Sequence, residues 1–357
     1  MSKELDTLQK IYLIARNDLL NTIINAKGVG TKTYYNTVLQ QVNKELAKLQ
    51  KASDSYISTE IPGEYKKALD ETYDYFQKNH LLMKPPGAFA SLHTEAIELL
   101  AREMQYNIRQ GHAQVGRQIL RYLNESQDEA LRAAGVAASA EKAAGGRTIL
   151  DMKKNMISKL QTEGFMTVQY GAGEKAYHVS LDSYTMLCAR STTREAGNLA
   201  RENQLIANGY DLVEMTSHFP TCEVCASLQG RIYSISGNDK RFPPLSVAFS
   251  SGYHNVHPNC RHSVHPWIED FKTPDEVKAA MEQSGQPFAD NRGEKEKGLY
   301  NKQQVENRQT RQDLYQYERY KAKLGSDAPK SFSAFRKAKK ADGEKWSELQ
   351  SQYKKKE

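Results

Sequence analysis

The chain has 357 residues, of which 39% are hydrophobic and 26% are charged, enough for two or three domains of ordinary size. No apolar run approaches the roughly 18–20 residues that cross a bilayer, and the opening MSKELDTLQK lacks the apolar core of a secretory signal, so we expect neither a membrane-spanning helix nor export by that route. Four cysteines are too few for a disulfide framework, which favours metal ligands or reduced thiols.

The positive charge is concentrated near the C-terminus. Residues 271–357 hold 20 lysines and arginines against 14 acidic residues, whereas the formal charge of the whole chain is +7. A basic segment of this kind can contact phosphate backbones or an acidic protein surface. A solvated helix face followed by a lysine tail is the simpler alternative.

Residues 1–144 are predicted to form a helical region. Over residues 2–27, apolar side chains recur every three or four positions, as in an amphipathic helix. These side chains are Leu5, Leu8, Tyr12, Ala15, Leu19 and Ile23. A second helix is predicted from about Thr33, and the two helices would form an αα-hairpin.

Two proline signals divide the rest of this region. Pro62 is expected to open a further helix that continues through Phe76. The Pro85-Pro86-Gly87 sequence then separates that helix from a long one over 91–131. A domain boundary is predicted at Gly145-Gly146, after an alanine-rich stretch.

Residues 145–270 are predicted to be a compact α+β domain. After a helix over 148–163, the segments FMTVQY and AYHVSL flank the turn GAGEK and predict a β-hairpin. A long helix over 181–208 follows, and short strands are expected in YDLVEMTSH and RIYSIS. The segment 271–357 is predicted to be a basic helical tail, with helices over 302–323 and 332–353. The predicted fold class is therefore α+β.

Three of the four cysteines and four of the nine histidines lie between Thr221 and Trp267, and His218 lies just before. Structural zinc takes four thiolate or imidazole ligands, commonly from two short-spaced pairs. The C-x-x-C and the H-x-x-C of this segment predict the ligand set Cys222, Cys225, His257 and Cys260. His254 and His262 are the substitutes if His257 points elsewhere. A full set of protein ligands indicates a structural ion, and simple packing of these residues around loops is the alternative.

Several motifs in this order resemble the phage head-morphogenesis proteins, the Mu F-like and minor capsid protein families of tailed bacteriophages. The residues that carry the resemblance are CEVC at 222–225, GRIYS at 230–234, Pro243-Pro244 and HPNCRH at 257–262, preceded by the helix ARSTTREAGNLAREN and followed by a Gln/Arg-rich helix. The resemblance covers about residues 145–355. His262 stands where a second cysteine is common in these families.

The resemblance implies a virion protein inside the head near the portal, which aids head morphogenesis and accompanies or contacts packaged DNA. The expected partners are the portal protein, the major capsid or scaffolding protein and the phage genome, with the host cytoplasm as the place of assembly. The N-terminal helices would dock on the portal or the capsid. Non-specific DNA contacts are predicted for the basic residues of the tail. These residues are Lys302, Arg308, Arg311, Arg319, Lys321, Lys323, Arg336, Lys337, Lys339 and Lys340.

The sequence gives weaker support to two other classes of function, and we expect no enzymatic activity. A zinc-dependent hydrolase or nuclease would use His254, His257 and His262 with Glu223 or Asp270 as general base, but the sequence has no H-E-x-x-H and no paired-carboxylate motif. A host nucleic-acid-binding regulator with a zinc knuckle would need a recognition helix, for which the sequence gives no signature.

Overall fold

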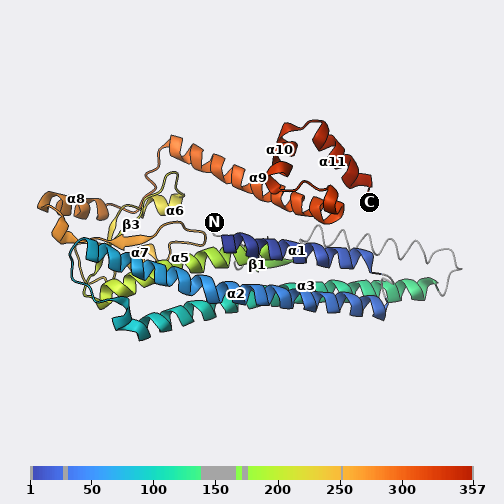
Figure 1. The fold of residues 1–357 in the computed structure, drawn as a ribbon, viewed down its shortest axis with the longest axis horizontal. Coiled ribbons are helices and arrows are strands. Elements are labelled where there is room, and N and C mark those ends of the chain that lie inside the picture. Colours follow the sequence, from blue (N-terminus) through green and yellow to red (C-terminus); the bar gives the residue numbers. More distant parts are fainter. Residues whose placement is uncertain (1–2, 27–30, 138–165, 171–175, 251, 356–357) are drawn as a thin grey trace. The chain divides into compact units, whose positions relative to one another are not determined.

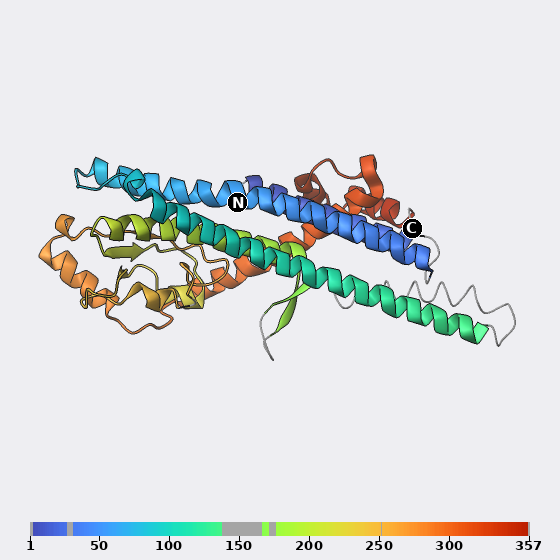
Figure 2. The same cartoon turned by 90° about the horizontal axis from the view of Figure 1, so that it is seen from below.

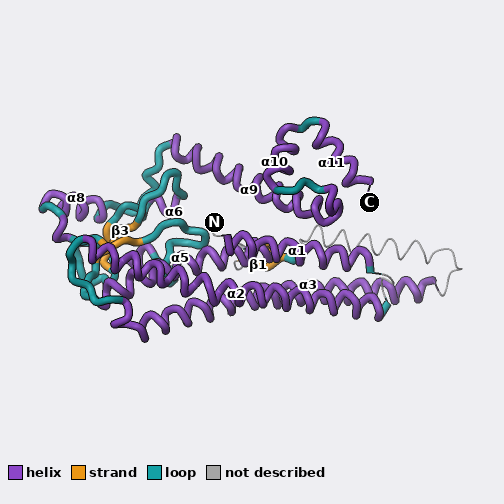
Figure 3. The backbone as a smooth tube through the Cα atoms, viewed as in Figure 1, coloured by secondary structure: helices purple, strands orange, loops and turns teal. Residues whose placement is uncertain are grey.

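The computed structural model describes residues 3–26, 31–137, 166–170, 176–250 and 252–355. Helices predominate and the strands are short (Figures 1 and 3), which confirms the predicted α+β class. The chain divides into two compact units. The first, called the knuckle unit, comprises Met1–Leu5, Gln50–His112 and Ser183–Tyr300. The second, called the helical unit, comprises Asp6–Leu49, Ala113–Asp182 and Asn301–Glu357.

The N-terminal helices are α1 (Lys3–Asn25), α2 (Lys32–Lys78) and α3 (Ala90–Ala137), with the short 3-10 helix η1 (Pro86–Phe89) before α3. The apolar positions predicted for the first helix are all buried. Tyr34 of α2 donates its hydroxyl to the carbonyl of Ile23 in α1 at 3.0 Å, which ties the two helices of the predicted αα-hairpin together. Figures 1 and 2 show α2 and α3 side by side.

The prediction that Pro62 opens a helix is wrong, because Pro62 lies inside the continuous helix α2. Proline removes one helical hydrogen bond and crowds the preceding turn, at a cost of about 3 kcal/mol. The neighbouring side chains of Ile61 and Tyr65 are fully buried. Tertiary burial on both sides of the proline therefore outweighs the local preference for a break.

The predicted β-hairpin is confirmed in the helical unit. Strands β1 (Thr167–Tyr170) and β2 (Tyr177–Ser180) pair antiparallel, with Thr167 opposite Ser180. The predicted turn 171–175, the predicted helix 148–163 and the boundary at 145–146 lie outside the described residues.

A small sheet forms in the knuckle unit from β3 (Leu212–Met215), β4 (Ile232–Ser234) and β5 (Val264–Pro266), in the order β4-β3-β5 and antiparallel throughout. Strand β5 was not predicted, since three residues ending in proline give almost no alternation to detect. Helix α5 (Leu181–Ala207) lies beside this sheet (Figure 2). The remaining short elements are α6 (Glu223–Ala226), α7 (Leu245–Ala248), η3 (Glu269–Phe271) and α8 (Pro274–Ser284).

The C-terminal elements are α9 (Glu294–Leu324), η4 (Gly325–Asp327), α10 (Phe332–Ala341) and α11 (Glu344–Lys355). The single helix predicted over 332–353 is wrong. Asp342 adopts a left-handed backbone (φ 45°) and caps α10, and Gly343 follows it before α11 begins. Aspartate is one of the few residues that tolerates this conformation, so the Asp-Gly pair ends the first helix and reorients the chain.

Residues 313–355, called the C-terminal module, have their own core within the helical unit. Its buried members are Tyr317, Tyr320, Leu324, Ala328, Phe335, Trp346 and Leu349. The rings contact one another at centroid distances from 4.2 Å (Tyr320–Tyr353) to 5.9 Å (Tyr320–Trp346). The predicted segments 1–144, 145–270 and 271–357 were assigned by expected function as well as by expected compactness. This division of the chain stays a prediction.

Candidate functional site

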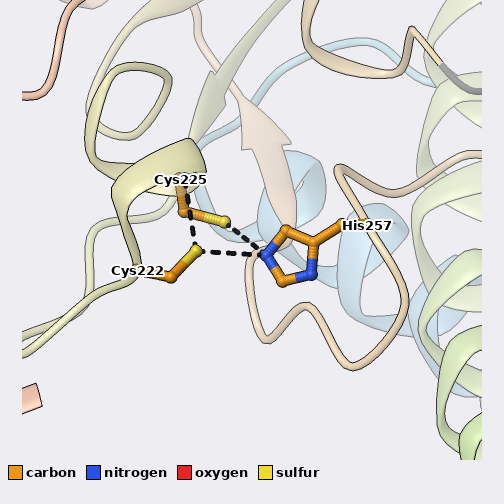
Figure 4. A group of neighbouring side chains, drawn as sticks. All are labelled: Cys222, Cys225 and His257. Atoms are coloured by element: carbon orange, nitrogen blue, oxygen red, sulfur yellow. Dashed lines mark hydrogen bonds between the residues drawn. The ribbon is translucent and has the colours of Figure 1, made fainter. Parts of the chain in front are cut away.

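The C-x-x-C sequence forms the start of the one-turn helix α6. Cys222 is the N-cap of this helix, and its sulfur accepts a hydrogen bond from the backbone N–H of Cys225 at 3.4 Å. One helical turn places side chains three positions apart on the same face. Both sulfurs therefore face the same side of the turn (Figure 4).

The H-x-x-C sequence forms a tight turn in the loop before β5. The N–H of Cys260 donates to the carbonyl of His257 at 2.9 Å, and Asn259 between them adopts a left-handed backbone with φ 65°. Asparagine is enriched in this conformation because its side chain is short and polar. The turn brings the His257 ring up to the two sulfurs of the C-x-x-C segment (Figure 4).

Five donor side chains meet in this place, and we call them the Cys/His cluster: Cys222, Cys225, His257, Cys260 and His262. His257 Nε2 lies 3.2 Å from Cys222 Sγ and 3.1 Å from Cys225 Sγ. Cys225 Sγ lies 3.8 Å from Cys260 Sγ, and Cys260 Sγ lies 3.5 Å from His262 Nδ1.

The donors form two groups of three that share Cys225. Cys222, Cys225 and His257 make one group, and Cys225, Cys260 and His262 make the other. Three of the four predicted ligands therefore lie together, and Cys260 joins them through Cys225. Zn–S bonds of about 2.3 Å and Zn–N bonds of about 2.0–2.1 Å in a tetrahedron require donors roughly 3.4–3.8 Å apart. The separations in the cluster lie close to this range, so each group of three donors fits part of a tetrahedral zinc site.

Hydrogen bonds within the cluster divide the thiols by charge. Contact with the Cys225 thiol lowers the pKa of both Cys222 and Cys260, helped by His257 and His262 respectively. The same contacts, together with burial, raise the pKa of the Cys225 thiol. The neighbouring Cys222 thiolate raises the pKa of His257 to about 9. A divalent cation is one group that would replace these shared protons and neutralise the thiolates.

His254, a predicted substitute, does not join the cluster. Its Nδ1 lies 2.9 Å from a carboxylate oxygen of Glu202 in α5, and its backbone N–H donates to Glu195 at 3.1 Å. Burial opposes charge on the His254 ring, but the hydrogen bond and negative charge of Glu202 together raise its pKa. His254 therefore anchors the loop to α5.

Helix α5 holds this loop with polar side chains whose role was missed from the sequence. The Asn198 side chain donates to the carbonyl of His254 at 2.8 Å and accepts from the N–H of Val264 at 3.2 Å. Arg194 donates to Ser263 Oγ at 2.8 Å. Asn198 is fully buried. A polar residue at a buried helical position was the available signal, since such groups are expected to bond a partner.

The GRIYS segment supports the other side of the knuckle unit through Arg231. This guanidinium is buried and donates to the carbonyls of Ser284, Gln286 and Pro287 at the end of α8, and it lies 4.4 Å from the centre of the Phe288 ring. Gly230 has φ 69°, and a Cβ there would lie 2.9 Å from Ser217 Oγ, so glycine is required.

The predicted DNA-binding residues fall into different environments. Those whose side chains are exposed are Lys302, Arg308, Arg311, Arg319, Lys321, Lys337 and Lys340. Arg336 and Lys339 instead pair with the buried Asp313 at 3.0 and 2.7 Å. The side chain of Lys323 lies outside the described part of the chain. Tyr317 and Tyr320 are buried in the C-terminal module, so their rings serve packing.

Within the described ranges, no helix is both long enough and apolar enough to cross a membrane.

The family model described as phage minor capsid protein 2 matches residues 31–340, which is most of the chain. The match includes the whole Cys/His cluster and nearly all of α10. Searches of curated proteins and of solved structures found no match.

Proposed function

The chain belongs to the phage minor capsid protein 2 family, and we propose that it is an internal head protein that lies near the portal and aids head morphogenesis. The single observation that carries this proposal is the family match over residues 31–340. Membership in a capsid protein family favours a virion component with a structural role. The partners that we propose are the portal protein and the major capsid or scaffolding protein, met in the host cytoplasm during assembly.

Quantitative mass spectrometry of purified, nuclease-treated virions tests the location. We expect a few to tens of copies per particle, protected from protease added outside the particle. A fall in copy number after DNA ejection would indicate delivery with the genome. Absence from particles, with the protein abundant in infected cytoplasm, would contradict the proposal.

The second part of the proposal is a structural zinc ion in the Cys/His cluster. What supports it is the presence of three thiols and two imidazoles within zinc-like distances, where the C-x-x-C turn meets the loop before β5. Thiolate and imidazole donors select zinc over hard cations such as magnesium. Elemental analysis of the full chain, purified without chelator, should give about one zinc per chain, and a chelator should lower the melting temperature.

The third part of the proposal is non-specific DNA contact by the C-terminal region. Residues 301–357 hold 15 lysines and arginines against eight acidic residues, which equals the charge excess of the whole chain. Two of those acids, Asp313 and Glu318, are buried, and Asp313 pairs with Arg336 and Lys339. Electrostatic binding of this kind is independent of sequence and weakens steeply with salt.

We further propose that function follows the three segments predicted from the sequence. Residues 1–144 would dock on the portal or capsid, 145–270 would form a rigid module around the cluster, and 271–357 would face DNA. The contacts from α5 support a rigid middle segment, because they hold the loop before β5 in place. Arg231 ties the start of β4 to the chain at and after the end of α8.

A zinc-dependent hydrolase or nuclease remains the alternative. It would need an open coordination position and a base close to the metal. The geometry favours the structural role instead, because five donors compete for four positions and His254 is engaged by Glu202. Hydrolysis of DNA by the zinc-loaded chain, lost in Glu223→Gln or Asp270→Asn, would favour the alternative.

A further inference from the structure

We infer that His262 is a metal-binding residue of the Cys/His cluster and that it competes with His257 for one coordination position. This inference rests on the proposed zinc ion. It goes beyond the predicted ligand set, in which His262 was only a substitute for a misplaced His257. In the structure both rings point at the sulfurs.

The surroundings of His262 are those of a ligand. Its side chain is only 4% exposed, and Nδ1 lies 3.5 Å from Cys260 Sγ. Its own backbone N–H donates to the same sulfur at 3.4 Å, which favours a thiolate there. On the far side of the ring, Nε2 lies 3.0 Å from Gln229 Oε1.

The proton of His262 is fixed by Gln229. The Gln229 oxygen also accepts from the backbone N–H of His218 at 2.9 Å. Because a backbone N–H can only donate, the amide atom at this position must be the oxygen and not the nitrogen. His262 Nε2 must then carry the proton that it shares with Gln229. The lone pair of the neutral ring therefore lies on Nδ1, toward the sulfurs.

His257 is oriented in the same way from the opposite side. Its Nδ1 lies 2.8 Å from the carbonyl oxygen of Pro258, which can only accept, so Nδ1 carries the proton and Nε2 faces the sulfurs of Cys222 and Cys225. Metal-binding histidines in general use this arrangement, with one ring nitrogen on the ion and the other donating to an oxygen. Both imidazoles of the cluster have it.

Two imidazoles and three sulfurs exceed the four places of a structural zinc ion. Cys225 belongs to both donor groups and Cys260 is buried beside it. Since the sulfurs come from both loops, either imidazole completes a tetrahedron after a small shift of Cys260 or Cys222. Loss of one histidine should then weaken binding only moderately, and loss of both should remove it.

The test is zinc affinity of the full chain, measured by chelator competition, together with the absorption of the cobalt form. His257→Ala and His262→Ala should each weaken binding by about 10-fold, within the range known for perturbed metal sites, and the double variant by at least about 1000-fold. His80→Asn, an exposed histidine with a left-handed backbone, is the matched control and should bind like the wild type.

Two further variants keep the test independent of folding. Gln229→Leu should weaken binding strongly in the His257→Ala background and weakly in the wild type, because of the two imidazoles it releases His262 and leaves His257 in place. His262→Cys should raise the sulfur-to-cobalt charge-transfer band, which a misfolded variant would not do. Unchanged affinity for His262→Ala in both backgrounds, with no change of the band in His262→Cys, would overturn the inference. A wild-type chain that binds neither zinc nor cobalt would overturn the proposed zinc ion itself.

Discussion

The Cys/His cluster and the C-terminal module are held together by different kinds of interaction. The cluster joins two irregular loops through sulfur and nitrogen donors, and polar side chains of α5 hold one of those loops in place. The C-terminal module joins three helical segments through buried aromatic rings, and its ion pairs surround a single buried acid. Both regions have a buried apolar core, and Cys225 and Cys260 belong to one of them. The cluster adds metal-type donors and fixed polar geometry to this packing, whereas the C-terminal module relies on its aromatic rings. The two should respond differently to metal removal, mutation and acid.

Cys225→Ser should have the largest effect, because it removes the sulfur that both donor groups share. Zinc content should fall from about one per chain to near zero. A ligand present about a thousandfold above its Kd stabilises the folded state by about 4 kcal/mol, which the variant would lose. Hydrogen exchange read by mass spectrometry should show faster exchange around the cluster and an unchanged exchange rate in the C-terminal module. The control is Cys188→Ser, because Cys188 belongs to neither donor group. Full zinc content in Cys225→Ser would refute the prediction that a zinc ion bound through Cys225 stabilises the cluster.

Phe335→Ala should produce the opposite pattern. Phe335 is fully buried between Tyr317, Tyr320 and Trp346. Truncation of a buried phenylalanine costs about 3–5 kcal/mol. We expect faster hydrogen exchange in the C-terminal module, with zinc content unchanged. The exposed Val305→Ala on α9 should alter neither, and protection of the module in Phe335→Ala would show that its aromatic core is not what holds it together.

Arg231→Met tests whether polar geometry matters as much as the metal in the knuckle unit. The methionine keeps much of the apolar stem but leaves the carbonyls of Ser284, Gln286 and Pro287 without their charged donor. We expect a loss of about 3 kcal/mol in the free energy of unfolding, from denaturant titration. Arg241→Met, whose guanidinium pairs with Asp239 and Glu269 at the surface, should cost less than about 1 kcal/mol. Equal effects of the two variants would contradict the role given to Arg231.

Acid should weaken the C-terminal module through Asp313. Burial alone would raise the pKa of Asp313, but hydrogen bonds from Lys339 and Arg336 hold it below its usual value. A carboxyl whose pKa is depressed by folding contributes stability above its unfolded pKa, and this stability is lost as the pH falls through the folded pKa. Exchange in the module should therefore accelerate below about pH 4, and Asp313→Asn should flatten this dependence. The same acid sensitivity in Asp313→Asn would place its origin elsewhere.

The smallest effect is expected on DNA affinity. Its measurement would rank the basic residues by their contribution to DNA binding. The exposed Lys337→Gln and Lys340→Gln together should reduce the slope of log affinity against log salt by about 2, since each phosphate contact adds about 0.9 to the slope for duplex DNA. Lys339→Gln should change the slope less, because its ammonium already pairs with Asp313 and Gln316. A binding titration with duplex DNA at several salt concentrations measures both. A larger change for Lys339→Gln would reverse this ranking.

Local pattern predicted the parts of the fold that depend on local physics. The periodicity from Leu5 to Ile23 and the alternation on both sides of residues 171–175 predicted α1 and the β1–β2 hairpin, because periodic burial is visible within one segment. The same reasoning failed at Pro62 and at Asp342. At Pro62 distant packing overrode a breaker, and at Asp342 the prediction of one continuous helix overlooked the turn signal of the Asp-Gly pair. Strand β5 was missed because its hydrogen bonds come from β3, some fifty residues earlier.

Three features could be read from the amino-acid sequence alone: sulfur and imidazole donors crowd into one segment, helices predominate, and positive charge gathers at the C-terminus. Composition and short spacings carry that information directly. The tertiary structure decided which donors share a sulfur, that His254 serves Glu202 and not the cluster, and that Arg336 and Lys339 are partly neutralised by Asp313. These outcomes depend on segments 23 to 52 residues apart meeting in space. Because a hydrogen bond or a metal bond acts over about 2–4 Å, only the folded backbone can choose among donors that the sequence leaves equivalent.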